Sequence, residues 1–279
     1  MITPPEEGFI IDHAYVPEHL PAYVHAVSEA EPHLLGEYLC FRIRDSLLFI
    51  GYPLAAPFDE KALGQAVESA VAGFRSRDVV LIAPKIPESL TGHRPRERDQ
   101  SYRLDLIRVA RNGKLRSMLR RAGRDGRVES SRDIREEHRS LIEEFLDSHP
   151  VSQETRYIFE RIPAYVSAVP TARVFGLRNR TGALVAFDVA EFGARDFAFY
   201  QFNFRSQTHY VPGASDLLLD AVISAAQSEG KRYLNMGLGI NSGVRRFKEK
   251  WGGQPFLPYE YCRYSPGRLT LFDALLQKL

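Results

Sequence analysis

Length, composition and charge describe a globular chain and exclude several kinds of protein. The chain has 279 residues, 44% of them hydrophobic and 26% charged, with a formal net charge of +2. This length exceeds the usual size of one hydrophobic core, so two domains are expected. No apolar segment approaches membrane-spanning length, roughly 20 residues. The start, MITPPEEG, lacks the basic region and apolar run of a secretion signal.

Two cysteines and the missing catalytic motifs narrow the class further. Cys40 and Cys262 are far apart, and each lies in an apolar, strand-like run. They are predicted to be buried thiols in a reducing cytoplasm, with no metal site or disulfide; peripheral association with the membrane stays open. The chain contains no NTPase phosphate-binding loop, dinucleotide glycine fingerprint, nucleophile elbow or zinc-ligand spacing. NTPase, dehydrogenase, serine hydrolase and metalloenzyme are therefore disfavoured.

The first half of the chain is predicted to form an α/β unit. Residues before Pro17 show no clear pattern and are expected to be an irregular lead-in. Apolar spacing and turn residues then predict a helix at 17–28, a hairpin of strands 37–44 and 47–52, a helix at 59–74, and the buried parallel strand VVLIA after Asp78.

The middle of the chain is predicted to contain one strand and three helices. The strand is 101–107, and the helix at 112–124 has only a narrow apolar stripe. Asp133 is predicted to cap a helix that ends at Leu146, and a third helix follows at 152–169. At the end of the chain, the tail 268–279 is predicted to be a terminal helix.

The second half repeats the element order of the first. Strands 172–177 and 184–192 are predicted to form a hairpin, strand 197–205 extends the sheet, helix 214–229 follows, and KRYLNMG occupies the place of VVLIA. The parallel lies in element order and apolar spacing, not in residue identity. It favours an internally duplicated α/β unit.

The turn before helix 214–229 is a candidate anion site. Pro212-Gly213-Ala214-Ser215 supplies an entry turn, and a helix N-terminus presents unpaired N–H groups and a positive dipole end. An ordinary strand-to-helix turn explains the same residues equally well. After the next strand, a glycine-rich turn leads into the basic helix SGVRRFKEKWGG.

Although the net charge is small, the basic residues are concentrated in two clusters. One runs from Arg108 to Arg127 with Asp125 as its only acid, and the other is RRFKEK at 245–250. Each is explained by a solvated helix face, but together they can line one cationic groove.

The element order and several segments resemble a known family. The segments are NGKLRSMLRRAGRDG, PGASDLLLDAVISAAQSEGKRYLNMGLG and GVRRFKEKWGG. They resemble tandem-GNAT proteins, which include the Fem peptidyltransferases and the catalytic domain of lysyl-phosphatidylglycerol synthase. The resemblance covers most of 100–264, and residues 1–99 by element order only. It implies an α/β (α+β) fold of mixed sheets flanked by helices: a GNAT-like domain at 1–110, a basic linking helix at 111–126, and a second GNAT-like domain at 127–279 with the active cleft.

The resemblance also implies transfer of an acyl or aminoacyl group to an amine or hydroxyl. In this fold two parallel strands splay apart, here 197–205 and 231–236, and their unpaired backbone groups hold the donor's arm. The donor is acyl-CoA or a charged tRNA, used as a co-substrate without a prosthetic group. The CoA-binding loop of ordinary GNAT enzymes is reduced here to Gly213 and Ala214, and Pro212 lacks a donor N–H. A tRNA-borne donor is therefore preferred to CoA. The acceptor, whether peptide, lipid or small amine, stays open, as do the oligomeric state and a non-catalytic role as an RNA- or protein-binding module.

The site candidates fall into three groups. The catalytic candidates are Tyr200, Asn235 and Glu191. The substrate-binding candidates are Gln201, Asn203, Tyr210, Gly213, Ala214, Ser215, Gly237, Asn241 and Lys248. The nucleic-acid-binding candidates are Arg116, Arg120, Arg121, Arg124, Arg245, Arg246 and Lys250, because exposed cations track phosphates. No metal site is predicted. Sheet packing, turn chemistry and solvated helix faces are the competing explanations.

Overall fold

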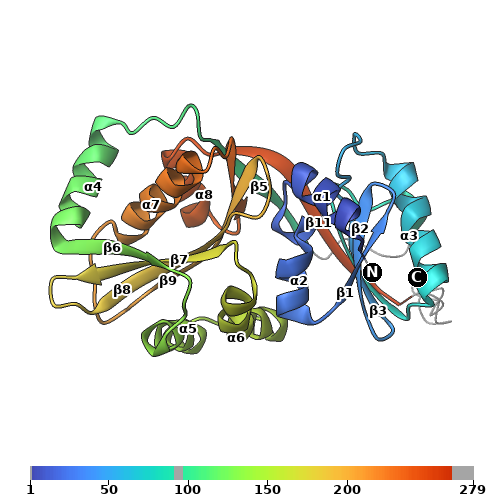
Figure 1. The fold of residues 1–279 in the computed structure, drawn as a ribbon, viewed down its shortest axis with the longest axis horizontal. Helices are drawn as coiled ribbons and strands as arrows, with labels where there is room; N and C mark the ends of the chain where they lie inside the picture. The colour runs from blue at the N-terminus through green and yellow to red at the C-terminus, as the bar shows by residue number, and fades with distance from the viewer. Residues whose placement is uncertain (1, 91–96, 266–279) are drawn as a thin grey trace, which may run out of the picture.

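A computed structural model describes residues 2–90 and 97–265. Within them the chain forms one mixed 11-stranded sheet flanked by helices (Figure 1), so the predicted α+β class is confirmed. The helices are α1 Pro4–His13, α2 Pro21–Ser28, α3 Glu60–Phe74, α4 Gly113–Asp125, α5 Glu136–Ser148, α6 Gln153–Ala168, α7 Ala214–Ser228 and α8 Ser242–Lys250. The strands are β1 Glu31–Leu35, β2 Tyr38–Ile43, β3 Ser46–Ile50, β4 Asp78–Ala83, β5 Glu97–Asp105, β6 Gly126–Ser131, β7 Ala172–Asn179, β8 Leu184–Glu191, β9 Phe197–Arg205, β10 Tyr233–Leu238 and β11 Gln254–Tyr264.

The two halves of the chain have the same order of elements. In the first half the β2–β3 hairpin leads through α3 to β4, which lies parallel to β3. In the second half the β8–β9 pair leads through α7 to β10, which lies parallel to β9. In each half the crossover helix buries one face against the sheet. The predicted duplication of element order is therefore present in the fold.

The halves exchange strands. The sheet order is β1-β2-β3-β4-β11-β5-β10-β9-β8-β7-β6. The long strand β11, from the end of the described chain, pairs with β4 of the first half, and β5 pairs with β10 of the second half. Figure 1 shows β11 running between the two halves. Because each half supplies a strand to the other, the sheet is continuous, and the boundaries at 110 and 126 stay a prediction.

Two layers of helices cover the second half. In Figure 1, α4 and α7 lie on one side of β6–β9 and α5 and α6 on the other. Leu218 and Val222 of α7 pack with Leu115 of α4 in one apolar core, and Ile162 and Tyr165 of α6 pack in another. Full burial of a large apolar side chain stabilises a fold by about 1.5–3 kcal/mol, so these two layers hold the sheet in place around β9.

Most element predictions are confirmed, and several are incomplete or wrong. The bounds of β9 match the prediction, and α3 and α4 begin one residue after the predicted starts, Asp59 and Asn112, which are their N-caps. Strands β1 and β6 were missed. The expected irregular lead-in contains α1, which begins with prolines and a capping box in which Thr3 N donates to the Glu6 carboxylate over 2.7 Å. The tail 268–279 lies outside the described residues.

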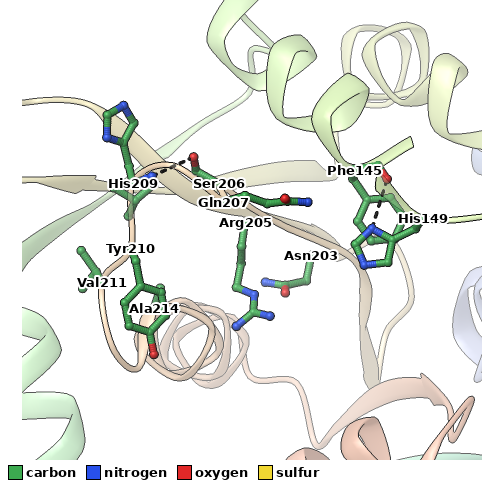
Figure 2. Close-up of a pocket in the computed structure, with 11 residues that line it drawn as sticks. Phe145, His149, Asn203, Arg205, Ser206, Gln207, His209, Tyr210, Val211 and Ala214 are labelled. Carbon is green, nitrogen blue, oxygen red and sulfur yellow. Dashed lines mark hydrogen bonds between the residues drawn. The ribbon is translucent and has the colours of Figure 1, made fainter. Parts of the chain in front are cut away.

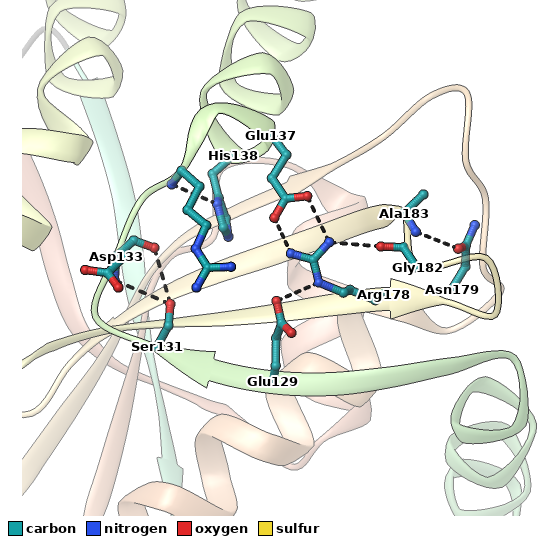
Figure 3. A network of polar contacts seen from close by, with 10 residues as sticks. Glu129, Ser131, Asp133, Glu137, His138, Arg178, Asn179, Gly182 and Ala183 are labelled. Atoms are coloured by element: carbon teal, nitrogen blue, oxygen red, sulfur yellow. Dashed lines mark hydrogen bonds and ion pairs between the residues drawn. The ribbon is translucent and has the colours of Figure 1, made fainter.

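Helix α5 begins two residues later than predicted, because its N-cap is Arg135 and not Asp133. Asp133 belongs to a turn in which its backbone groups bond Ser131, and the helix starts at Glu136. Figure 3 shows why the start is fixed there: Arg178 of β7 pairs with Glu137 in the first turn of α5 and with Glu129 of β6. The Arg178 side chain lowers the pKa of Glu137. This network joins the sheet edge to α5 and is structural.

No helix in residues 2–90 and 97–265 is long and apolar enough to cross a membrane. Cys40 and Cys262 are both buried.

Candidate functional site

Strands β9 and β10 separate after three paired residues. Their parallel register covers Tyr233 with Phe197, Leu234 with Ala198 and Asn235 with Phe199. Beyond that point β10 stays with β5 as far as Leu238, while β9 follows β8 to Arg205. From Tyr200 onward, the side of β9 that faces β10 therefore has no strand partner. Backbone N–H and C=O groups left unpaired in this way are available to an extended ligand.

The corresponding strands of the first half do not separate. β3 and β4 stay in register over five residue pairs, from Ser46 with Asp78 to Ile50 with Ile82. A further bond joins Gly51 N to Ile82 O over 2.7 Å, and a Cβ placed on Gly51 would lie 2.7 Å from that of Ala83. The first half therefore offers no equivalent gap among the described residues.

A bulge in β9 distributes its side chains over both faces of the sheet. Val189 pairs with Phe202 and Ala190 with Tyr200, which leaves Gln201 as the extra residue. Tyr200 packs toward α7, whereas Phe202 lies in the core formed with α5 and α6. The Gln201 amide lies 2.6 Å from the Tyr165 hydroxyl of α6. The gap can therefore be reached from both faces of the sheet.

The gap opens into a cavity of about 850 Å³. Its walls come from β9, the loop 210–216, the end of β10, α8, and the edges of α5 and α6. Ten sequence candidates line it: Tyr200, Gln201, Asn203, Tyr210, Gly213, Ala214, Ser215, Gly237, Asn241 and Lys248. This volume suits the reactive end of a larger substrate.

A side pocket of about 390 Å³ extends the cavity at the end of β9. Figure 2 shows Asn203 and Arg205 pointing into the same space, with His149 opposite and the His209 ring turned away. The His149 ring stacks on Phe145 at 4.2 Å between centroids. Arg205 has no ion-pair partner in the part of the chain that the structure describes. The pocket therefore carries a free positive charge beside the main cavity.

Lys248 is the one lysine that lines the cavity among the described residues. It comes from α8, it is only 4% exposed, and its Nζ donates to Leu238 O over 2.5 Å. A Cβ built on Gly237 would lie 3.8 Å from this Nζ and 3.9 Å from Tyr200 O, which places the amine at the base of the gap. Burial lowers the pKa of Lys248 to about 7, against a smaller opposing effect of Asp99. A substantial fraction of the amine is therefore neutral at physiological pH.

The hydroxyl of Tyr200 lies over a buried acid. Asp188 of β8 is fully buried, and its Oδ1 accepts a hydrogen bond from Asn203. The Asn203 carbonyl in turn accepts from the Ser215 hydroxyl over 3.2 Å. Burial raises the pKa of Asp188 to about 8, although hydrogen bonding to Asn203 and Tyr200 opposes the shift. Tyr200, Asn203 and Ser215 are thus brought together, as predicted residues of one site.

Asn235 and Glu191 lie outside the cavity. Asn235 donates to Tyr15 O over 2.8 Å and accepts from Gly237 N over 2.8 Å, so its side chain fixes the turn at the end of β10. The carboxylate of Glu191 faces α6, where it accepts from the Tyr165 hydroxyl over 2.5 Å and from Gly193 N over 3.0 Å. Both side chains have structural partners, and neither touches the cavity wall.

The N-terminus of α7 already carries a negative charge. Gly213 is the N-cap with a φ of 80°, and Asp216 lies in the first turn. The carboxylate of Asp216 pairs with Lys250 at 2.5 Å and accepts from the Trp251 ring nitrogen over 2.9 Å. A carboxylate at this position interacts with the dipole that a phosphate would use, and it also engages Lys250, a cation that could bind a phosphate there. The loop therefore fits a pyrophosphate less well than the sequence suggested.

Gly213 also supports packing between helices. A Cβ on it would lie 3.1 Å from Met118 and 3.5 Å from Ala122, both on α4. Substituting Gly213 would therefore disturb the docking of α4 and strain a positive φ, so this position does not separate binding from folding.

The rim of the cavity carries two exposed apolar side chains. Tyr210 is 75% exposed in the loop before α7, and Ile240 is 71% exposed in the turn before α8. Ile240 has a φ of 53°, and its N–H donates to the Asp99 carboxylate over 2.6 Å. A β-branched residue with positive φ is strained, and such strain clusters at functional positions.

Replacement of Ile240 by Asn is expected to stabilise the protein by about 1 kcal/mol, because Asn tolerates the left-handed conformation. The same change is expected to weaken ligand binding at the rim. Thermal unfolding reports the first effect and donor affinity the second. A loss of stability would mean that Ile240 contributes packing that its exposure does not reveal.

The basic candidates lie on two helices near the cavity. Helix α8 lines it directly, and α4 packs against α7 and the Gly213 loop. Arg116, Arg120, Arg121, Arg124, Arg245 and Arg246 are exposed and have no acidic partner among the described residues. Lys250 differs, because it pairs with Asp216. Six exposed arginines without acidic partners, on two helices that both adjoin the elements of the cavity wall, fit a polyanion better than a solvated helix face does.

Sequence reasoning did not select Asp188 or Asp216 as site residues. Asp188 stands in the apolar strand LVAFDVAE, where a lone acid is itself a signal, because unpaired acids are rarely buried. No cluster of three or more metal-ligating residues occurs within the described ranges.

Comparison with known proteins identifies the fold. No family model matches the chain, and no curated protein matches it. Among solved structures, L-PGS from Bacillus licheniformis is 19% identical with a TM-score of 0.56, covering 96% of this chain and 98% of that one. FemX is 12% identical with a TM-score of 0.61, covering 100% and 98%. A tandem GNAT protein from the clavulanic acid biosynthesis pathway is 12% identical with a TM-score of 0.54, covering 82% and 78%. The fold is thus that of the tandem-GNAT proteins, as the sequence resemblance predicted.

Proposed function

We propose that this protein is a transferase that moves an aminoacyl group from a charged tRNA to an amine or hydroxyl acceptor. The observation that carries the proposal is the cavity at the separated strands, which has a buried lysine at its base. Exposed arginines without acidic partners among the described residues lie on α8, which lines the cavity, and on α4, which packs against the Gly213 loop. Fold likeness to L-PGS and FemX supports a transferase.

The arrangement supplies what an ester aminolysis needs. The free backbone edge of β9 holds the extended aminoacyl arm, which brings its carbonyl to the base of the gap. An acceptor amine attacks that carbonyl and must lose a proton. Lys248 is buried beside Gly237, and its lowered pKa of about 7 allows it to take that proton as a general base.

Charge distribution favours tRNA over CoA as the carrier. CoA requires a helix N-terminus and loop that hold a pyrophosphate, and here Asp216 occupies the first turn of α7. A tRNA needs a broad basic surface, which α4 and α8 supply. Acetyl-CoA remains the second candidate donor because a tandem GNAT protein shares the fold.

Combined replacement of Arg116, Arg120 and Arg121 by alanine is expected to weaken tRNA binding about 30-fold or more near 0.1 M salt. The slope of log affinity against log salt should fall by about 2 to 3, because each phosphate contact contributes nearly one unit. Filter binding or anisotropy across a salt series measures both quantities.

A matched control replaces three exposed arginines of the first half: Arg44, Arg75 and Arg77. This variant removes the same charge and should bind tRNA almost as the native chain does. Equal weakening by both variants would mean that net charge, not the α4 surface, governs binding. Turnover is tested separately with labelled aminoacyl-tRNA and with acetyl-CoA. Consumption of acetyl-CoA alone would reverse the order of the donors, and inertness toward both would favour a non-catalytic binding module.

A further inference from the structure

Asp188 is a buried acid behind the wall of the cavity, and only one of its two carboxylate oxygens has a well-formed hydrogen bond among the described residues. It is fully buried in β8, and only its Oδ1 has a partner, the amide of Asn203. The other oxygen, Oδ2, is buried without a hydrogen-bond partner of good geometry in the part of the chain that the structure describes. Leaving a buried polar atom unsatisfied costs about 1–3 kcal/mol, so a structural role for this oxygen is a poor explanation.

The Tyr200 hydroxyl has the same unusual property and lies beside that oxygen. It too is buried without a well-formed hydrogen bond among the described residues. Asp188 pairs across the strands with Asn203, and Tyr200 pairs with Ala190, so the two side chains are diagonal neighbours on the α7 face. The charge of Asp188 and a hydrogen bond to it both raise the pKa of Tyr200, after burial itself. Asp188 Oδ2 and the Tyr200 hydroxyl thus form a poorly aligned pair behind the cavity wall, and neither atom has another polar partner of good geometry among the described residues.

We propose that Asp188 is a proton store that acts through Tyr200 on the leaving group of the transfer reaction. This inference rests on the proposed function, because it assigns a proton donor to the same site. Asp188 does not touch the substrate and is a positioning and relay residue, whereas Tyr200 lines the cavity.

Every proton and electron pair is accounted for in the transfer step. The acceptor nitrogen forms a bond to the ester carbonyl carbon and passes its proton to neutral Lys248. As the tetrahedral intermediate collapses, the bond from that carbon to the carrier oxygen breaks, and the electron pair stays on the oxygen. That oxygen takes the Tyr200 proton, and Tyr200 takes the proton of Asp188. The cycle ends with Asp188 ionised and Lys248 protonated, and solvent restores both.

The environments of the two groups suit these opposite roles. Burial raises the pKa of Asp188 to about 8 and lowers that of Lys248 to about 7. Near pH 7.5 the carboxyl group of Asp188 is largely protonated and the amine of Lys248 is partly neutral. Each group is thus in the opposite protonation state to the one it has in water, so the carboxyl can donate a proton and the amine can accept one. The other groups that act on this pair are few: Asp216 of α7 and Arg205 of β9 affect Tyr200, and Asp99 of β5 affects Lys248.

The rate profile with pH tests the role of Asp188. With aminoacyl-tRNA as donor, kcat/KM should rise to about pH 7 and fall above about pH 8. In Asp188→Asn the falling limb should disappear and the rate near pH 7.5 should drop about 100-fold. Asn keeps the shape and the bond to Asn203, so the fold should persist. Persistence of the falling limb in this variant would overturn the proposal.

Glu191→Gln is the matched control. Glu191 is also a buried acid of β8, and burial also raises its pKa, but it faces α6. Whatever this change does to the rate, the falling limb should remain. Loss of the limb in Glu191→Gln instead of Asp188→Asn would transfer the role to Glu191.

A second measurement needs no turnover, so it separates this inference from the proposed function. The carboxyl carbon of Asp188 is titrated by NMR, with Asp188→Asn to assign its signal. In Tyr200→Phe the pKa of Asp188 should rise further, because hydrogen bonding to Tyr200 lowers it in the native chain. An unchanged pKa would show that the two groups are not coupled and would remove the relay. Coupling without turnover of either donor would overturn the proposed function alone.

Discussion

Replacement of Lys248 by Met is expected to reduce transfer from aminoacyl-tRNA by about 100- to 10,000-fold, the usual contribution of a general base. The variant keeps the length and the apolar part of the side chain while removing the amine. Binding of the carrier should change little, because the exposed arginines of α4 and α8 supply the phosphate contacts. The loss should therefore appear in kcat, measured by release of the labelled ester.

The same variant should be more stable than the native protein below about pH 7. Burial depresses the folded-state pKa of Lys248 from 10.5 to about 7. The unfolded chain therefore binds this proton more tightly, and the native protein is penalised at low pH and recovers between about pH 7 and 10.5. Met removes the penalty but leaves Leu238 O without its donor, so the net gain is on the order of 2 kcal/mol. Lower activity with higher stability is the pattern of a functional residue.

Lys61→Met is the control for the loss of a lysine. Lys61 is exposed on α3 in the first half of the chain, far from β10 and α8. It should leave both transfer and stability within experimental error. Near-native transfer by Lys248→Met would exclude this amine as the general base and would mean that the acceptor loses its proton without help from Lys248.

The sequence predicted the parts of the site that depend on local pattern. The alternation of FAFYQFNFR gives β9 its bounds, and the apolar spacing after Gly213 gives α7. The segment FKEKW placed Lys248 on a helix close to a strand end, where the structure also has it. Ten of the proposed substrate and catalytic positions therefore gather at one cavity.

The parts that the sequence did not predict depend on long-range pairing. Nothing local in β5 or β11 indicates that each enters the sheet of the other half. Asn235 looked like a cavity residue because it ends a strand, yet its amide bonds to Tyr15 O, which is 220 residues away. The bulge at Gln201 also shifts which side chains face α7, and strand periodicity alone cannot locate it. Asp188 belongs to the site only because strand pairing places it beside Asn203 and Tyr200, and the sequence does not show that pairing.

Replacement of Asp188 by Asn is expected to alter the pH dependence of stability more than any other single change considered. The folded-state pKa is raised from 3.8 to about 8 by burial. Below about pH 4 both states bind the proton, and the buried acid carries no penalty. Between about pH 4 and 8 the unfolded chain has lost the proton while the folded chain keeps it, so native stability falls as pH rises.

Asn has no proton to lose, so its stability lacks this slope. The free energy of unfolding of the variant, relative to the native protein, should therefore rise by about 1.4 kcal/mol per pH unit across that window and level off above pH 8. Urea unfolding at unit pH intervals measures the difference. Glu191 and Glu18, whose pKa values burial also raises, act equally in both proteins and cancel. A difference that stays constant from pH 4 to 8 would mean that Asp188 ionises normally, and then it holds no proton at neutral pH to pass to Tyr200.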